Sequence, residues 1–147
     1  MAVRVRFPRL ELQPDRRNHR LIESWSYEWD HGGKTREFHV AAGFVTDLGS
    51  IPRPLWGLIA PAELTEGALA HDLVYRYAGR VPGRFFLIEG EPCSTPWTRE
   101  DADRLFARLL RESGVVRWKR RSAYRAVRLA GWLPWRRAER RILGRRR

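Results

Sequence analysis

TEGALAHDLVYRYA, residues 65–78, is the stretch that decides the fold. Two rows of side chains recur along it at helical spacing: Leu69, Leu73 and Arg76 in one, and Leu64, Ala68, His71 and Tyr75 in the other. This pattern predicts a helix over residues 65–78, with Thr65 as its N-cap and Gly79 directly after its end. His71 and Asp72 diverge by about 100° around the axis of such a helix, so the two side chains can do different work.

Two extended segments precede this helix. Residues 20–29 alternate as a strand does, and a second strand is predicted from Phe38 to Val45. Between them, DHGG at residues 30–33 is a turn signal, so we predict a β-hairpin or small sheet within the first 45 residues. The next segment, DLGSIPRP at 47–54, is too rich in Gly and Pro for a regular element and is expected to form a structured loop. The apolar stretch at 55–60 is interpreted as core, with an acyl-chain channel or a membrane contact as alternatives.

Further helices are predicted downstream, after a mostly irregular segment at 81–97 with a short extended piece at 85–88. Thr98 opens a capping box in which Asp101 replaces the usual Glu. An apolar stripe at helical spacing follows it: Ala102, Leu105, Phe106, Leu109 and Leu110. Gly114 ends this helix, and another is predicted from about Trp118 to Leu133, where Pro134 interrupts it. The predicted fold class is therefore α+β, a small sheet or hairpin followed by two or three packed helices.

The chain of 147 residues fits one domain, which we place at residues 1–134, followed by a basic tail at 135–147 that is either a short amphipathic helix or disordered. Cys93 is the single cysteine, so no internal disulfide is possible, and we interpret it as an ordinary free thiol. No apolar run at the N-terminus has the form of a secretory signal, and no stretch approaches the ~20 apolar residues that span a bilayer.

The net charge of +12 is concentrated at one end of the chain. Residues 117–147 hold thirteen basic side chains and one acid, Glu139, so this segment alone accounts for the whole net charge. Such an end attracts phosphate, whether on lipid head groups or on nucleic acid. Aromatic residues interleave with these arginines, a mixture that suits a membrane interface or single-stranded nucleic acid. The alternative is that the aromatic rings pack on the domain while the arginines face water, and the arginine content itself is also typical of a GC-rich genome.

Two motifs carry a resemblance to a known family. FVTDLGSIP at 44–52 has the form F-x-T-D-x-x-S-I-P, and residues 71–75 have the form H-D-x-x-Y. Together they resemble DUF1353, a phage and prophage family of unknown function, and the resemblance covers roughly residues 38–133. The segment AVRLAG at 126–131 is similar to a further pattern of that family, so residues 116–133 are expected to belong to the fold. The resemblance implies a phage or prophage origin, with the protein in the host cytoplasm or the virion, where phage proteins would be its partners.

The same residues resemble the site of bacterial and fungal phospholipases A2. HDLVYR at 71–76 looks like their H-D-x-x-Y-R helix, DLGS at 47–50 is similar to their calcium loop, and DRLF at 103–106 resembles their D-x-x-F helix. Two features depart from the pattern: no cysteines bracket these motifs, and Leu48-Gly49 stands where those enzymes usually have Gly then Cys.

The phospholipase resemblance implies a role for each matched residue. His71 would act as general base, and Asp103 would orient its imidazole. Asp47, Asp72 and the backbone carbonyl of Leu48 would hold a Ca²⁺ ion. On a helical wheel Asp101 and Asp103 both lie at an edge of the apolar stripe, and the D-x-x-F match selects Asp103.

The sequence therefore predicts a calcium-assisted ester hydrolase of phospholipase A2 type, acting on phospholipid or a related amphiphile. Tyr75, one turn beyond His71, and Ser50 are further candidate site residues. A serine nucleophile is not expected, because Ser50 is not in a G-x-S-x-G elbow. Three alternatives stay open: a structural virion or tail protein with a degenerate site, a nucleic-acid-binding accessory protein, and a hydrolase of another bond.

Overall fold

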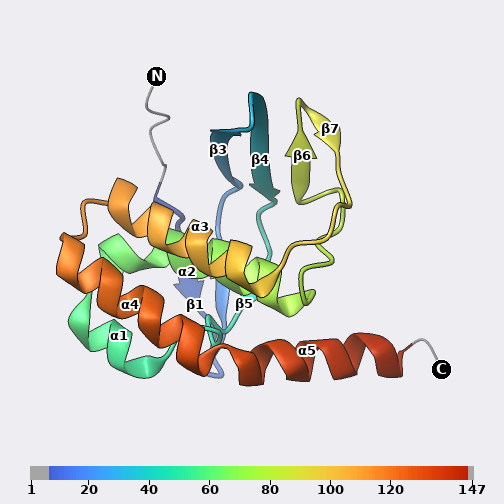
Figure 1. Cartoon of the computed structure of the whole chain (residues 1–147). Helices are drawn as coiled ribbons and strands as arrows, with labels where there is room; N and C mark the ends of the chain where they lie inside the picture. The colour runs from blue at the N-terminus through green and yellow to red at the C-terminus, as the bar shows by residue number, and fades with distance from the viewer. Residues whose placement is uncertain (1–6, 146–147) are drawn as a thin grey trace.

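The computed structural model describes residues 7–145. Its strands form two small antiparallel sheets, and its helices pack together on one side of them (Figure 1). The first sheet has the order β1-β2-β5 and consists of β1 (Leu10–Leu12), β2 (His19–Leu21) and β5 (Val45–Thr46). The second has the order β3-β4-β6-β7 and consists of β3 (Trp25–His31), β4 (Lys34–Val40), β6 (Phe86–Ile88) and β7 (Glu91–Pro92). The predicted α+β class is confirmed.

The predicted hairpin is present as β3 and β4, which pair from Trp25 with Val40 to His31 with Lys34. Gly32 and Gly33 form its turn with φ of +61° and +73°, values that glycine adopts without steric cost. The predicted strand bounds were wrong: the segment 20–29 is divided between β2 and β3, and the segment 38–45 between β4 and β5. The divided strands serve different sheets, a separation that alternation within one segment does not reveal.

Five helices follow: α1 (Arg53–Leu58), α2 (Pro61–Arg76), α3 (Arg99–Glu112), α4 (Arg117–Ala130) and α5 (Trp132–Gly144). The central helix, α2, starts at Pro61 and not after Thr65 as predicted. Proline is already set for the first helical turn, and the Thr65 hydroxyl instead donates to the carbonyl of Pro61 at 2.5 Å. Gly79 does follow the end of α2, with φ of +80° and its N–H donating to the Val74 carbonyl at 3.0 Å.

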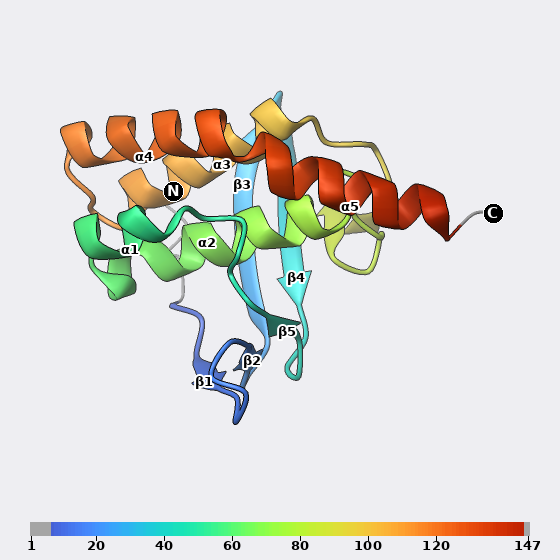
Figure 2. The ribbon, with the colours of Figure 1, turned by 90° about the horizontal axis from the view of Figure 1, so that it is seen from below.

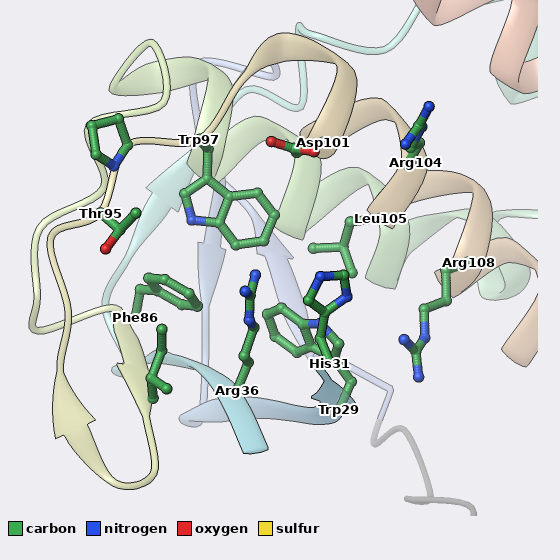
Figure 3. Close-up of a pocket in the computed structure, with 12 residues that line it drawn as sticks. Trp29, His31, Arg36, Phe86, Thr95, Trp97, Asp101, Arg104, Leu105 and Arg108 are labelled. Atoms are coloured by element: carbon green, nitrogen blue, oxygen red, sulfur yellow. The ribbon is translucent and has the colours of Figure 1, made fainter. Parts of the chain in front are cut away.

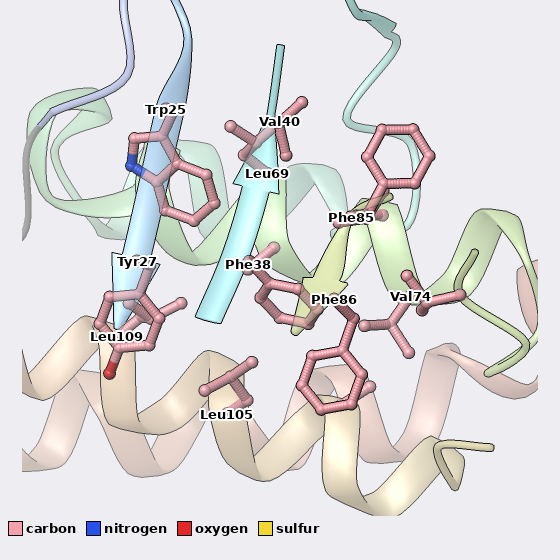
Figure 4. Packing of buried hydrophobic residues seen from close by; sticks show 14 of the residues in the cluster. Trp25, Tyr27, Phe38, Val40, Leu69, Val74, Phe85, Phe86, Leu105 and Leu109 are labelled. Atoms are coloured by element: carbon pink, nitrogen blue, oxygen red, sulfur yellow. The ribbon is translucent and has the colours of Figure 1, made fainter. Parts of the chain in front are cut away.

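Every residue of α2 from Leu64 to Tyr75 is buried. One side of the helix meets the aromatic side chains of the β3–β4 sheet, where Trp25, Tyr27 and Trp29 alternate inward along β3 (Figure 4). Another side packs along α3, whose capping box is formed by Thr98 and Asp101 as predicted. Burial on all sides explains why polar residues of α2 meet partners inside the protein and not solvent.

The remaining helices close the molecule. The predicted loop at 47–54 ends where α1 begins, and Leu55 and Ile59 are buried, which agrees with the core interpretation of 55–60. Helix α4 packs on α3, and α5 crosses the C-terminal end of α2 (Figure 2). Pro134 lies in the first turn of α5 and does not end a helix there, so the expected boundary after residue 134 falls inside α5. None of the helices within residues 7–145 is long and apolar enough to cross a bilayer.

Candidate functional site

His71 lies in the middle of α2 with its side chain fully buried. Its two ring nitrogens face different partners. Nε2 lies 2.7 Å from Asp103 Oδ1 on α3, and Nδ1 lies 3.0 Å from Ser50 Oγ in the loop before α1. The structure thus joins three predicted site residues, which are 21 and 32 positions from His71, into one continuous chain of hydrogen bonds.

Asp103 is the centre of the polar network. Its Oδ1 also accepts a hydrogen bond from Tyr75 Oη at 2.7 Å, which gives this predicted residue a role beside the imidazole. Its Oδ2 accepts from Arg128 Nη1 of α4 at 2.8 Å, and Arg99 Nη1 lies 3.5 Å away. Two guanidinium groups therefore compensate the charge of a carboxylate whose side chain has no exposed surface.

These contacts set the protonation states. Burial lowers the pKa of His71 more than Asp103 raises it, so the imidazole is neutral near pH 7. Burial alone would raise the pKa of Asp103, but hydrogen bonds from His71, Tyr75 and Arg128 hold it below its ordinary value. An ionised Asp103 only accepts hydrogen bonds, so the imidazole proton lies on Nε2 and the Nδ1 lone pair faces Ser50. His71 is thus arranged as a base toward the Ser50 hydroxyl.

The loop before α1 places Ser50 on the imidazole. Leu48 has φ of +53°, and its side chain is buried. The Leu48 N–H donates to Thr46 Oγ1 at 3.0 Å, and its carbonyl accepts from the Ile51 N–H at 3.3 Å. These two bonds fold the chain back so that Ser50 reaches His71.

Asp72 points away from His71, as the helical spacing predicted, and its carboxylate accepts a hydrogen bond from the Thr46 hydroxyl. Arg76 Nη2 lies 3.5 Å from the same carboxylate oxygen. Burial raises the pKa of Asp72 above its ordinary value, although Thr46 and Arg76 oppose this. Asp72 is therefore engaged by the protein's own donors.

The predicted calcium ligands are less well arranged for a metal than the imidazole is for a base. Asp47 accepts from the Gly49 N–H at 2.8 Å, the Leu48 carbonyl closes the turn, and Asp72 holds Thr46 and Arg76. Ca²⁺ takes six to eight oxygen ligands, commonly from several carboxylates. Within residues 7–145 no group of three or more His, Cys, Asp or Glu side chains is placed to hold a metal. In this arrangement the residues do not fit a calcium ion, because Arg76 would have to leave Asp72.

A cavity of about 760 Å³ opens beside the polar network. Ser50, Asp72 and Tyr75 contribute to its wall, and so do arginines of α2 and α5: Arg76, Arg137 and Arg141. Ala138 and Ile142 add apolar surface from α5. The α5 residues were assigned to a tail by the sequence, and no pattern in the sequence linked them to the site. Arg128 and Arg99 were missed as well, although Arg128 lies inside the AVRLAG segment.

The AVRLAG segment has a structural explanation in the same network. Arg128 binds Asp103, and the Val127 carbonyl accepts from Arg99 at 3.4 Å. A Cβ atom on Gly131 would overlap the Tyr75 hydroxyl, so only glycine lets α4 end against Tyr75. The three positions of this pattern therefore hold the partners of His71 and Asp103.

The motifs and the helices that carry them are shared with a known family. A family model described as a protein of unknown function (DUF1353) matches residues 19–127. The chain belongs to the DUF1353 family. The match includes Ser50, His71 and Asp103 and ends at Val127, before α5. Comparisons with curated proteins and with solved structures gave no match. The network of His71 thus lies within the part of the chain that defines DUF1353, whereas the basic cavity wall from α5 lies outside it.

Proposed function

We propose that this DUF1353 protein hydrolyses an ester bond in an anionic amphiphile, with His71 as general base, Asp103 as its orienting acid and Ser50 as nucleophile. One observation carries the proposal: the Ser50, His71 and Asp103 side chains form a hydrogen-bonded chain with distances of 3.0 and 2.7 Å. A serine, a base and an orienting carboxylate in this order are the parts of a nucleophilic acyl-transfer site, and such sites are identified by geometry and not by sequence position.

The proposed reaction proceeds in two steps. The Ser50 hydroxyl gives its proton to His71 Nδ1 while its oxygen attacks the ester carbonyl, and the alcohol leaves with that proton. Water then attacks the acyl group on Ser50, again with His71 as base, and releases the acid. Asp103 holds the imidazole by Nε2 throughout and stabilises the imidazolium form, and Arg128 keeps Asp103 ionised.

The cavity beside Ser50 supports an anionic substrate with an apolar part. Its arginines attract a phosphate or carboxylate, and its surface from Ala138 and Ile142 accommodates a hydrocarbon group. A phospholipid or a related amphiphile has both features. The phage origin that the motifs imply is compatible with a lipid or cell-envelope substrate and stays a prediction.

The role of Ser50 separates this mechanism from the water-based one implied by the phospholipase A2 resemblance. The His71 side chain has no exposed surface, so a water molecule could meet Nδ1 only by displacing the Ser50 hydroxyl. Ser50→Ala would therefore abolish acyl transfer through serine, but would open Nδ1 to water in the other mechanism. Ser122→Ala is a matched control, because Ser122 is exposed on α4 and its hydroxyl donates only to the Trp118 carbonyl at 2.9 Å.

The test combines hydrolysis of phospholipid vesicles with covalent labelling by a fluorophosphonate probe. We expect hydrolysis and labelling at Ser50 by wild type and Ser122→Ala, both lost in Ser50→Ala and His71→Ala, and both insensitive to a calcium chelator. Hydrolysis that requires calcium and survives Ser50→Ala would replace this mechanism with the metal-assisted one. Absence of both hydrolysis and labelling over several lipid and soluble esters, with or without calcium, would refute an enzymatic role and leave the network as a structural one.

A further inference from the structure

A groove lined by arginines runs between α3 and α4, away from the candidate active site. It has a volume of about 770 Å³. The basic residues that line it come from both helices: Arg104, Arg108 and Arg111 from α3, and Arg117, Arg120, Arg121 and Arg125 from α4. No acidic side chain lines the groove, and its remaining wall comes from Ala107 and Tyr124. Such a concentration of one charge over about 20 Å of helix matches a linear polyanion.

Most of these arginines are available for a partner. Arg104 pairs with Glu100 at 2.5 Å, and Arg108 with Glu112 at 3.0 Å. The other five make no ion pair among residues 7–145: Arg111, Arg117, Arg120, Arg121 and Arg125. Five guanidinium groups side by side repel one another, so an anion bound along the groove would relieve that repulsion.

A second cavity of about 430 Å³ adjoins the groove, with walls of a different kind (Figure 3). Trp29, Phe86 and Trp97 supply aromatic surface, and the ring centroids of Trp29 and Trp97 are 6.0 Å apart. Arg36 extends from β4 between these rings (Figure 3). Its Nε atom is buried and has no hydrogen-bond partner, so a donor that normally meets an acceptor is left unsatisfied in this pocket.

The two cavities are continuous because Arg104 and Arg108 line both of them. A ligand that occupied the pair would present a flat, polar-edged group to the aromatic pocket and a row of negative charges to the groove. We propose that this surface binds single-stranded nucleic acid, with phosphates along the α3–α4 groove and one unstacked base in the aromatic pocket, where Arg36 donates to a base carbonyl or ring nitrogen. Aromatic surface beside a basic groove is the combination by which proteins bind single strands without strict sequence preference.

Two other polyanions fit less well. A duplex keeps its bases stacked, so it could use the groove but would leave the aromatic pocket empty. A bilayer is flat and would not enter a concave groove, although Trp118, Leu129 and Trp132 are exposed along α4 and the start of α5 and would be the residues to meet it. The proposal does not rest on the esterase activity, because Ser50, His71 and Asp103 line neither of these two cavities.

Fluorescence anisotropy with a labelled oligodeoxythymidine of about 12 nucleotides tests the groove. If the five unpaired arginines each neutralise one phosphate, log K should fall against log salt with a slope of about −3.5, roughly a 100-fold loss from about 50 to 200 mM. Changing Arg120, Arg121 and Arg125 to Gln should make that slope shallower by about 2. The same change at Arg17, Arg20 and Arg140, which are exposed on other surfaces, removes equal charge and should have little effect on the slope.

The pocket is tested on the unaltered protein by comparing the oligonucleotide with an abasic strand of equal charge. We expect about tenfold weaker binding of the abasic strand, and loss of that preference in Arg36→Met. Equal binding of the abasic strand, the single strand and the duplex would overturn the base pocket. Equal effects of the groove and control arginine sets would overturn the groove, and so would binding of anionic phosphatidylglycerol vesicles by a protein that binds no oligonucleotide.

Discussion

Replacing Asp103 with alanine should be among the most destabilising single changes in this protein. The carboxylate has no exposed surface and receives hydrogen bonds from His71 and Tyr75 at 2.7 Å each and from Arg128 at 2.8 Å. Its removal leaves the His71 and Tyr75 donors buried without an acceptor. Arg128 and Arg99 are 31% and 23% exposed, so these two side chains can regain water.

The magnitude follows from the unsatisfied groups. An orphaned buried donor costs about 1–3 kcal/mol, and breaking a buried charge pair typically costs about 3–5 kcal/mol. We therefore expect Asp103→Ala to lower the free energy of unfolding by about 4 kcal/mol. Asp103→Asn should cost less, about 1–2 kcal/mol, because the amide oxygen still accepts from His71 and Tyr75 and only the contact with Arg128 is lost.

Urea unfolding followed by circular dichroism measures both values, with an unchanged slope against urea as the sign that only stability has moved. Asp101→Ala is the matched control on the same helix, since Asp101 is exposed and contributes only to the cap of α3, worth about 1 kcal/mol. A cost below about 1 kcal/mol for Asp103→Ala, or equal costs for the alanine and asparagine variants, would refute the argument that the buried acceptor holds His71 and Tyr75 in place.

Three further outcomes are expected. Burial raises the pKa of Glu66 to about 7. The native state therefore keeps a proton that the unfolded chain releases above about pH 4.5, so the contribution of Glu66 to stability falls by up to roughly 3 kcal/mol as the pH rises to 7. The difference in unfolding free energy between wild type and Glu66→Gln should show this trend, and a difference that is flat with pH would contradict it. Gly79 and Gly90 have nearly equal φ of +80° and +78°, but only at Gly79 would a Cβ atom overlap the carbonyl oxygen of Trp97. Gly79→Ala should therefore lower the melting temperature well beyond Gly90→Ala, by a free energy of about 2 kcal/mol, and equal shifts would show that the backbone relaxes freely there. Thr98→Ala removes the side-chain acceptor of the capping box and should cost about 1 kcal/mol in urea unfolding, with no loss indicating that Asp101 alone caps α3.

Local signals in the sequence predicted much of this fold. The Gly32-Gly33 turn and the Thr98 capping box each depend on residues within a few positions of one another, and both are present. Thr65 failed as an N-cap because Pro61, four residues earlier, already provides a favourable first turn. The division of residues 20–29 between two sheets depends on pairing with β5 and β4, which are distant in sequence. Propensity within one segment cannot encode such pairing.

The candidate site divides in the same way. The order of the motifs and the position of Asp103 on a helical wheel predicted that His71 and Asp103 share a site, and the structure places them 2.7 Å apart. The contact of Ser50 with Nδ1 depends on the left-handed conformation of Leu48, which no residue type announces, since leucine rarely adopts it. The role of Arg128 depends on how α4 packs against α3, so it follows from tertiary structure alone.

The basic end of the chain illustrates why a charge count is a poor guide to where charge acts. Counted along the sequence, residues 117–147 form one cationic segment. In the folded protein the break at Gly131 and the helical period send its arginines to three places: Arg128 to Asp103, the outward arginines of α4 to the groove with α3, and Arg137 and Arg141 to the cavity beside Ser50. The groove and the Ser50 cavity share no residue. Arginine changes in α4 should therefore weaken polyanion binding while ester hydrolysis persists, and changes at Arg137 and Arg141 should do the reverse. If both sets of changes weaken both activities equally, the charge acts as one diffuse field, and neither cavity is a site of its own.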